Sequence, residues 1–376
     1  MKKFKQELFN LLCIQAPSGK EKKVADYLFP VLERLCDKVF LDDYGNLLAE
    51  KKVGTGEGAT IILSAHMDTV NNIQQDRKVL FDAKTNTFHS TKGVLGADDR
   101  AGIAIILAVL RNLHLTEFDG TLKIAFSREE ETGCVGANHI DPNWYTDANL
   151  AIVVDRKGSR DIVTGCFSPY NFCSESVGKF FENTSAMLGM DWKSVGGGVS
   201  DATVFSGRGI NSVNLSAGYE NEHTPQEIVN LVHCRDTINL ILQVLSVVNT
   251  FVESFDEVPA PILYSISGSP WELTDEELYY AQDEYHNTGE VLFYDSPDQI
   301  GTVTGSVVSS YVSLQQGVRS RGAEKVKIQE IFMEEQNFER LIDQYCIITG
   351  YSPGYRKHVD SRANSYTANG SSELDG

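Results

Sequence analysis

The fold class is decided by one short stretch, TIILSAH, at residues 60–66. Its small and apolar residues follow one another without alternation and end on a histidine, which is typical of a strand buried on both faces. Similar short apolar runs lie at residues 122–126, 151–154 and 212–215, and helical patterns lie at residues 101–113, 172–188 and 231–251. Short buried strands among helices predict an α/β fold, in which a mixed, largely parallel sheet is sandwiched by helices.

The composition shifts at residues 254–261, where two acidic residues and two prolines follow the last of these helical patterns. We therefore expect one domain over residues 1–257 and a C-terminal extension of unassigned role over residues 258–360. The last stretch, residues 361–376, is rich in Ser, Ala, Asn and Gly, a composition typical of a flexible tail.

The 376 residues carry 33 Lys and Arg against 52 Asp and Glu, a formal net charge of −19. This charge disfavours nucleic acid and anionic membranes as partners. A spanning helix would need a run of about 18 apolar residues, and no window of the sequence approaches one. The seven cysteines are odd in number and never spaced as C-x-x-C, which is typical of reduced thiols. We expect a soluble cytoplasmic protein without nucleic-acid or membrane partners.

Five polar stretches follow apolar runs or begin helices, and all are rich in His, Asp or Glu. They are residues 66–69, 96–102 and 128–133, Asp155, and residues 222–225. In open α/β sheets, ligands bind at the carboxyl ends of the strands. Each stretch alone has an ordinary explanation, such as helix capping or a solvated turn. Five such explanations at once are an improbable coincidence, so we expect the five stretches to form one site.

The residue types in these stretches favour metal ions. Histidine and carboxylate ligands together suit Zn²⁺, with Mn²⁺ or Co²⁺ as substitutes. Two such ions in one site repel each other unless an anion bridges them, so one carboxylate has to be shared. One histidine and one carboxylate for each ion, together with the shared carboxylate, use five residues. The sequence therefore predicts a site for two divalent ions.

The same stretches carry recognisable motifs. In chain order they are SAHMDTV (64–70), LGADDRAG (95–102), EETG (130–133), GGGVSDA (196–202) and EHTP (222–225). Over about residues 1–255, the motifs and their order resemble the co-catalytic zinc exopeptidases. That superfamily includes peptidase T, carboxypeptidase G, the bacterial leucyl aminopeptidases and the tetrahedral aminopeptidases.

The resemblance implies a role for each motif residue. Asp98 bridges the two ions, His66 and Asp155 complete one site, and Glu131 and His223 complete the other. Glu130 is implied as the general base, and Asp68 is implied to hydrogen-bond His66 and fix its ring. Adjacent glutamates can divide this work, because a metal ligand stays ionised while its neighbour takes a proton from water and passes it to the leaving amine.

The spacing of the motifs distinguishes branches of the superfamily. Relatives of the peptidase T and carboxypeptidase G type insert a lid domain after the residue that matches Asp155, and tetrahedral aminopeptidases insert a domain between the first two motifs. Here Gly196 follows Asp155 too closely for a lid, and Asp98 follows Asp68 too closely for the other insertion. The chain therefore resembles the compact leucyl aminopeptidase type, while the residues around His223 are more similar to peptidase T.

We predict a two-zinc aminopeptidase that removes N-terminal residues from short peptides, with a homo-oligomer as one possible state. Asp201, Glu220 and Glu222 are candidates for holding the substrate ammonium. A carboxypeptidase or N-acyl amino acid amidohydrolase of the same superfamily is the alternative, but it needs a basic group for the substrate carboxylate. The sequence around the motifs offers few such groups, of which Arg100 and Arg128 are the nearest. A glutaminyl cyclase-like transferase and a non-catalytic binding protein are less favoured, because the full ligand set is present.

Overall fold

The computed structural model describes residues 1–71, 74–166 and 170–259, together with the backbone of five short strands after residue 260. The chain divides into two compact units, Met1–Pro259 and Ala260–Gly376. All predicted site residues belong to the first unit. The tail predicted at residues 361–376 lies outside the described residues.

A central sheet runs through the first unit in the strand order β1-β2-β6-β3-β7-β11-β8-β10, with β9 paired to β8. Its strands are β1 (Lys38–Leu41), β2 (Leu47–Val53), β3 (Ala59–His66), β6 (Gly120–Ser127), β7 (Leu150–Arg156), β8 (Asp161–Cys166), β9 (Tyr170–Asn171), β10 (Lys193–Gly197) and β11 (Ser212–Ser216). The central strands β6, β3, β7 and β11 are parallel, and so are β8 and β10. The remaining pairs are antiparallel. The predicted mixed sheet is confirmed, with residues 60–66 forming most of its central strand β3.

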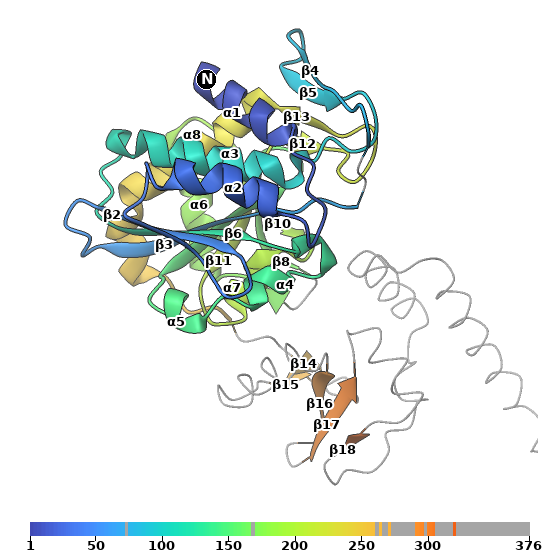
Figure 1. The fold of residues 1–376 in the computed structure, drawn as a ribbon. Helices are drawn as coiled ribbons and strands as arrows, with labels where there is room; N and C mark the ends of the chain where they lie inside the picture. Colours follow the sequence, from blue (N-terminus) through green and yellow to red (C-terminus); the bar gives the residue numbers. More distant parts are fainter. Residues whose placement is uncertain are drawn as a thin grey trace, which may run out of the picture. The chain divides into compact units, whose positions relative to one another are not determined.

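Alternate residues of β3 pack into two separate cores, one on each face of the sheet. Ile61 and Leu63 belong to a large cluster that includes α1 (Lys2–Leu12), α2 (Lys22–Leu32), α3 (Ala97–Asn112), α6 (Glu175–Met187) and α8 (Leu231–Phe251). Ile62 belongs to a smaller cluster that includes α5 (Pro142–Tyr145) and α7 (Asp201–Ser206). Figure 1 shows α1, α2, α3 and α8 on one side of the sheet, with α5, α7 and the short α4 (Val135–Asn138) on the other. Full burial of each such side chain contributes about 1.5–3 kcal/mol, so both layers fix the position of β3.

A second, smaller sheet lies beside the large one and was not anticipated from the sequence. It has the order β12-β13-β5-β4. Its strands are β4 (Val79–Asp82), β5 (Thr87–Ser90), β12 (Tyr219–Glu220) and β13 (Ile228–Asn230). All of its pairings are antiparallel. This sheet holds the turn between β12 and β13, which carries His223.

Helix α8 also tests the expectation that no segment spans a membrane. Residues Leu231–Ser254, which include α8 and the 3-10 turn Val252–Ser254, are long and apolar enough to cross a membrane by length and composition alone. The core helix of a soluble protein passes the same test, and 56% of the apolar window is buried in this structure.

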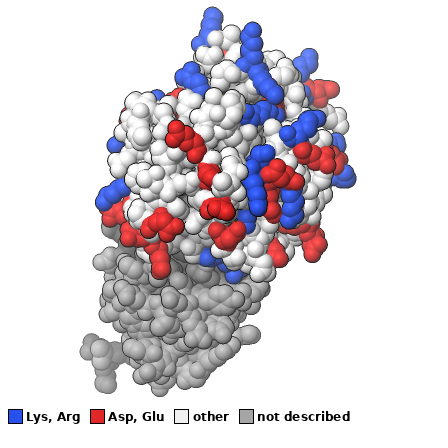
Figure 2. Space-filling model, turned by 90° about the vertical axis from the view of Figure 1, so that its left-hand side faces the viewer, with Lys and Arg blue, Asp and Glu red and all other residues white. Residues whose placement is uncertain are grey.

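Figure 2 shows acidic and basic side chains interspersed on one face of the molecule.

The second unit is described only by the backbone of its strands. They are β14 (Leu263–Tyr264), β15 (Pro270–Trp271), β16 (Glu290–Ser296), β17 (Gln299–Thr304) and β18 (Arg319–Ser320). β14 pairs with β15, and β16, β17 and β18 form a three-stranded antiparallel sheet.

Candidate active site

Three parallel strands bring the first polar residues to one edge of the sheet. His66 is the last residue of β3, the 3-10 turn Glu130–Thr132 follows β6, and Asp155 lies near the end of β7. Asp98 comes from the start of α3, where the backbone of Asp98 and Asp99 is not yet helical and the peptide bond between them is cis. Nε2 of His66 lies 2.9 Å from Oδ1 of Asp98 and 3.4 Å from Oδ1 of Asp155.

The other oxygen of Asp98 faces a second histidine. Nε2 of His223 lies 3.1 Å from Oδ2 of Asp98 and 2.9 Å from Oε2 of Glu131. Asp98 therefore stands between the pair formed by His66 and Asp155 and the pair formed by Glu131 and His223. All five residues predicted as metal ligands are brought together, with one carboxylate oxygen of Asp98 toward each half.

The two halves differ in their exposure to solvent. The side chain of His66 is 1% exposed, whereas that of His223 is 47% exposed. His223 also has a backbone φ of 61°, a conformation that is uncommon outside glycine. His66 is therefore buried in the sheet and His223 faces solvent, whereas the carboxylates of Asp155 and Glu131 are largely buried in both halves.

The site concentrates negative charge in a buried place. Burial, with the nearby carboxylate of Asp98, raises the pKa of Asp155 to about 7. Burial and the charge of Asp155 also raise the pKa of Glu130 well above its usual range. Hydrogen bonds to Asp98 and Glu131 raise the pKa of His223 to about 11. Carboxylates so crowded are stabilised by cations, and this donor set of two imidazoles and three carboxylates fits divalent metal ions.

Asp68 connects His66 at the end of β3 to the turn that carries Glu130 and Glu131. Its Oδ1 lies 3.2 Å from Nδ1 of His66, as expected for a residue that orients the ring. The carboxylate also accepts hydrogen bonds from the backbone N–H groups of Glu130 at 3.0 Å and Glu131 at 3.2 Å, and from the hydroxyl of Ser18 at 2.7 Å. Asp68 thus positions the glutamate turn as well as the histidine.

The three consecutive glutamates point in different directions. Glu129 has a backbone φ of 52°, and its carboxylate accepts a hydrogen bond from the hydroxyl of Tyr44 at 2.8 Å. Oε2 of Glu130 lies 3.9 Å from Nε2 of His66, and Glu131 lies against His223. Glu130 and Glu131 therefore face the site from adjacent positions, whereas Glu129 does not.

Glu227 is a supporting residue that the sequence did not single out. It lies four positions after His223 and is buried, and its carboxylate accepts three backbone N–H groups of the loop before α3. The donors are Gly96 at 2.8 Å, Ala97 at 2.7 Å and Asp98 at 3.0 Å. Burial raises the pKa of Glu227 to about 7. Glu227 therefore fastens the Asp98 loop to the segment that follows His223.

Two further supporting residues were also missed. The hydroxyl of Tyr219 donates to Oδ1 of Asp155 at 3.0 Å. Asp99 is buried and accepts the backbone N–H groups of His66 and Gly102. A tyrosine on a short strand and the second residue of an Asp-Asp pair carry no spacing signal of their own, so only the assembled site reveals these contacts.

The residues predicted to hold a substrate ammonium lie in three different settings. Asp201 is buried at the start of α7, accepts a hydrogen bond from Ser127, and lies close to Glu130 and Cys134. Glu220 is exposed on β12. Glu222 forms an ion pair with Lys157 at 2.7 Å.

Neither arginine near the motifs is free to meet a substrate. Arg100 is buried and donates to the backbone carbonyl of Met67 at 2.8 Å. Arg128 donates to the carboxylate of Glu21 at 2.8 Å and to the backbone carbonyl of Tyr44 at 2.7 Å. Both arginines therefore support loops around the site.

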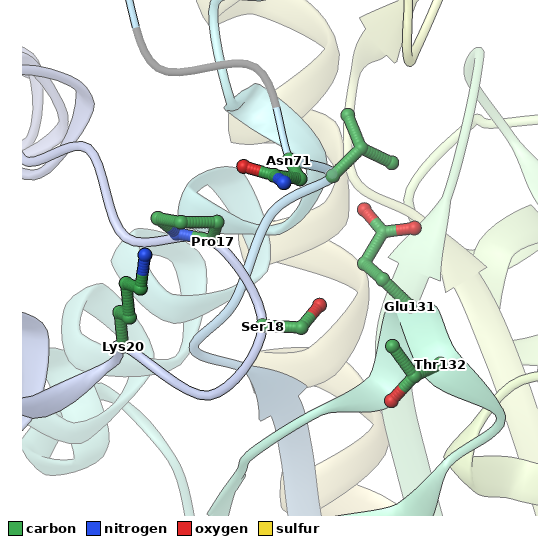
Figure 3. Close-up of a pocket in the computed structure, with 7 residues that line it drawn as sticks. Pro17, Ser18, Lys20, Asn71, Glu131 and Thr132 are labelled. Atoms are coloured by element: carbon green, nitrogen blue, oxygen red, sulfur yellow. The ribbon is translucent and has the colours of Figure 1, made fainter.

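A pocket of about 340 Å³ adjoins Glu131. It is lined by Pro17, Ser18, Lys20, Val70, Asn71, Glu131 and Thr132. Figure 3 shows Lys20 and Pro17 on one side of this pocket, Glu131 and Thr132 on the other, and Ser18 between them. Glu131 is both a pocket wall and a candidate metal ligand, so the pocket adjoins the candidate metal centre.

Comparison with known proteins links this geometry to peptidases. The sequence model of the M42 glutamyl aminopeptidase family matches residues 71–240. An uncharacterized protein of Bacillus subtilis is 28% identical over 166 residues, which cover 42% of this chain and 44% of that protein. Peptidase T of Clostridium botulinum is 33% identical over 116 residues, which cover 30% of this chain and 28% of that enzyme. The chain thus spans less than half the length of the curated relatives it matches.

Solved structures show the same fold. The aminopeptidase PepT of Bacillus cereus superposes with a TM-score of 0.59 at 19% identity, covering 65% of this chain and 98% of that one. An aminopeptidase of the archaeon Desulfurococcus kamchatkensis gives a TM-score of 0.58 at 16% identity, covering 68% of this chain and 98% of that one. The predicted fold class is confirmed, and the matches to the M42 family model and to peptidase T agree with the peptidase resemblance that the motifs indicate.

Proposed function

We propose that this protein is a metallo-aminopeptidase that removes N-terminal residues from short peptides. The observation that carries the proposal is the placement of Asp98, which presents one carboxylate oxygen to each of two histidines. A carboxylate in this position can offset the repulsion between two divalent ions. We expect zinc as the native metal, with manganese or cobalt as substitutes.

The five ligand residues would hold the ions in two connected half-sites. His66 and Asp155 serve one ion, Glu131 and His223 serve the other, and Asp98 serves both. When bound, the ions would acidify a water molecule and polarise the scissile carbonyl. Asp68 orients the ring of His66. The carboxylate of Asp68 is itself held in place by the backbone N–H groups of Glu130 and Glu131.

Glu130 is our candidate for the general base. Its carboxylate faces the site, and its backbone is fixed by Asp68. Burial and the neighbouring carboxylates raise the pKa of Glu130, so its ionised form is a stronger base, suited to take a proton from water and pass it to the leaving amine. Glu131, one residue further on, lies against His223 and serves as a ligand instead.

The polarity of the site favours the amino end of a peptide. The residues around the candidate metal centre are mostly acidic, and both nearby arginines are bound to other groups. An acidic surrounding suits a protonated α-amino group. Asp201, Glu220 and Glu222 remain candidates for contact with this group.

Several broader features of the protein belong to this proposal. Residues 1–257 form the catalytic domain, without an inserted lid, and a role for residues 258–376 is not assigned. The six cysteines among the described residues are free thiols, which supports a reducing, cytoplasmic location. A structural neighbour with a TM-score of 0.53, the TET1 peptidase of Pyrococcus horikoshii, can assemble into a tetrahedron or an octahedral shell. We therefore include a homo-oligomer in the proposal.

The proposal is tested with the zinc-loaded protein and paired peptides that differ only at their amino end. We expect cleavage of a free-amine tripeptide amide and little cleavage of its N-acetylated form. Amidation of the carboxyl end should affect the rate far less than acetylation of the amine. Efficient cleavage of N-acetylated peptides or N-acyl amino acids, without cleavage of free-amine amides, would contradict the proposal and support an amidohydrolase.

A further inference from the structure

The pocket beside Glu131 has an uneven distribution of charge. Of its seven lining residues, only Lys20 and Glu131 are charged. Glu131 is directed toward His223 and is engaged with the candidate metal centre. Lys20 is exposed, and its ammonium forms no ion pair with any carboxylate of the described residues.

Three other cations in this region form ion pairs. Arg128 pairs with Glu21, Lys157 pairs with Glu222, and Lys22 pairs with Asp26 at 2.7 Å. Lys20 is thus a cation that lines the pocket and is left without an acidic partner in the described part of the chain.

The hydroxyl groups of the pocket are already engaged as donors. Ser18 donates to Oδ2 of Asp68 at 2.7 Å, and Thr132 donates to the backbone carbonyl of Glu129 at 3.1 Å. The ammonium of Lys20 therefore remains as a free charged donor in a pocket whose volume of about 340 Å³ suits a small ligand. A carboxylate is the ligand group that such a donor pairs with.

We propose that Lys20 determines substrate specificity by pairing with a carboxylate of the peptide, supplied either by its C-terminus or by an acidic side chain. This inference rests on the proposed peptidase function. A peptide cleaved at the ions that Glu131 and the other ligands would hold has room to extend into the adjoining pocket toward Lys20 (Figure 3). Because Lys20 is exposed, water screens the pair, and the preference should be modest, about five- to tenfold.

The test compares ratios of kcat/KM within each protein variant, so that differences in metal loading cancel. Three peptides are used: a neutral tripeptide amide, the same tripeptide with a free C-terminal carboxylate, and the neutral amide with one residue replaced by glutamate. In the zinc-loaded parent protein, at least one carboxylate peptide should exceed the neutral amide by about five- to tenfold, mainly through a lower KM. The peptide that gains identifies the source of the carboxylate.

Variants of Lys20 then assign the preference to this residue. Lys20→Ala should reduce the ratio of kcat/KM for the carboxylate peptide to kcat/KM for the neutral amide to about one. Lys20→Glu should bring this ratio below one, and Lys20→Arg should retain most of the preference. Lys22→Ala is the matched control, because it removes a nearby lysine that does not line the pocket, and its ratio should equal that of the parent. A parent ratio of one, or an unchanged ratio in Lys20→Glu, would overturn the inference. Failure to cleave even the neutral amide would instead overturn the proposed peptidase function.

Discussion

The two halves of the candidate metal centre are built in different ways. His66 and Asp155 lie on adjacent parallel strands, β3 and β7, whose side chains pack into both cores of the first unit. His223 lies on a turn of the small second sheet, and its side chain is 47% exposed. The first half inherits its geometry from the central sheet, whereas the second depends on contacts that tie a surface turn to it.

Glu227 links the segment that follows His223 to the segment that carries Asp98. It follows His223 by four residues and accepts three N–H groups from the loop that presents Asp98. The bridging carboxylate and the exposed histidine are therefore positioned by one buried side chain. The two half-sites therefore need not respond equally to mutation, and single substitutions can separate them.

The largest effect is expected at the residue common to both halves. Asp98→Ala should lose most of both ions and all measurable turnover, because the anion between the two cations is removed. Elemental analysis after zinc saturation and desalting should find about two ions per chain in the parent protein. Retention of the parent's metal content in Asp98→Ala would show that the two halves are not bridged by this carboxylate.

Substitution of the adjacent residues Glu130 and Glu131 should have two different effects, a loss of turnover alone and a loss of bound metal. Glu130→Gln should lower kcat by about 10²- to 10⁴-fold with nearly intact metal content, because the amide keeps the shape of the side chain but cannot accept the proton. Glu131→Gln should lose metal together with activity, since its carboxylate lies against His223 as a proposed ligand. Parallel metal analysis and kinetics distinguish the two.

Glu129→Gln is the matched control for this pair. Its carboxylate is bonded to Tyr44 and faces away from His66 and His223. It should keep both metal and most turnover. Identical behaviour of Glu130→Gln and Glu131→Gln would refute the division of roles and bring Glu129 back as a candidate base.

Much of the buried half could be predicted from the sequence, because His66 and Asp155 follow continuous apolar runs that form strands. Helical spacing likewise predicts residues 231–251, and the structure has α8 over Leu231–Phe251. The second sheet was missed because β12 has two residues and β13 has three, too few for a periodic pattern to form.

Supporting residues could not be predicted, because their roles come from contacts between distant segments. Glu227 reaches residues about 130 positions earlier in the chain, and Ser18 reaches Asp68 across 50 positions. Lys20 likewise could not be predicted as a basic group of the site, because it lies outside the motifs in the sequence and only the fold brings it and Glu131 to one pocket. Side chains that act through tertiary contacts need the assembled structure.

The next largest effect on metal binding is expected for substitutions of Glu227. Glu227→Ala should weaken binding of both ions, because Glu227 holds the segment that presents the shared ligand Asp98. The loss should be larger, about 10- to 100-fold, for the ion held by Glu131 and His223, because Glu227 also follows His223 closely in the chain. Glu227→Gln should be milder, because its remaining oxygen can still accept two of the three N–H groups. Competition with a chromophoric zinc chelator measures both steps.

The control for Glu227 is its exposed neighbour Gln226. Gln226→Ala should leave both affinities unchanged, because the side chain of Gln226 makes no hydrogen bond within the described residues. Equal weakening of both ions in Glu227→Ala would mean that the residue supports the whole site rather than the half with His223.

The smallest effect is the pH dependence of metal binding, which arises from His223 and from Asp155, whose pKa is raised to about 7. Hydrogen bonds to Asp98 and Glu131 raise the pKa of His223 to about 11, so in the metal-free protein this ring is protonated at neutral pH. A metal ion has to displace that proton, and its affinity must rise with pH below the pKa. Each displaced proton changes the affinity about tenfold per pH unit. Chelator competition at pH 7 and pH 8, corrected for protonation of the chelator, should show this slope, and His114→Asn, at an exposed histidine outside the site, should not alter it. An affinity independent of pH would show that the imidazoles are neutral and Asp155 is ionised before the metal binds, and that the carboxylates around the imidazoles are weaker electrostatic partners than their 2.9–3.4 Å distances indicate.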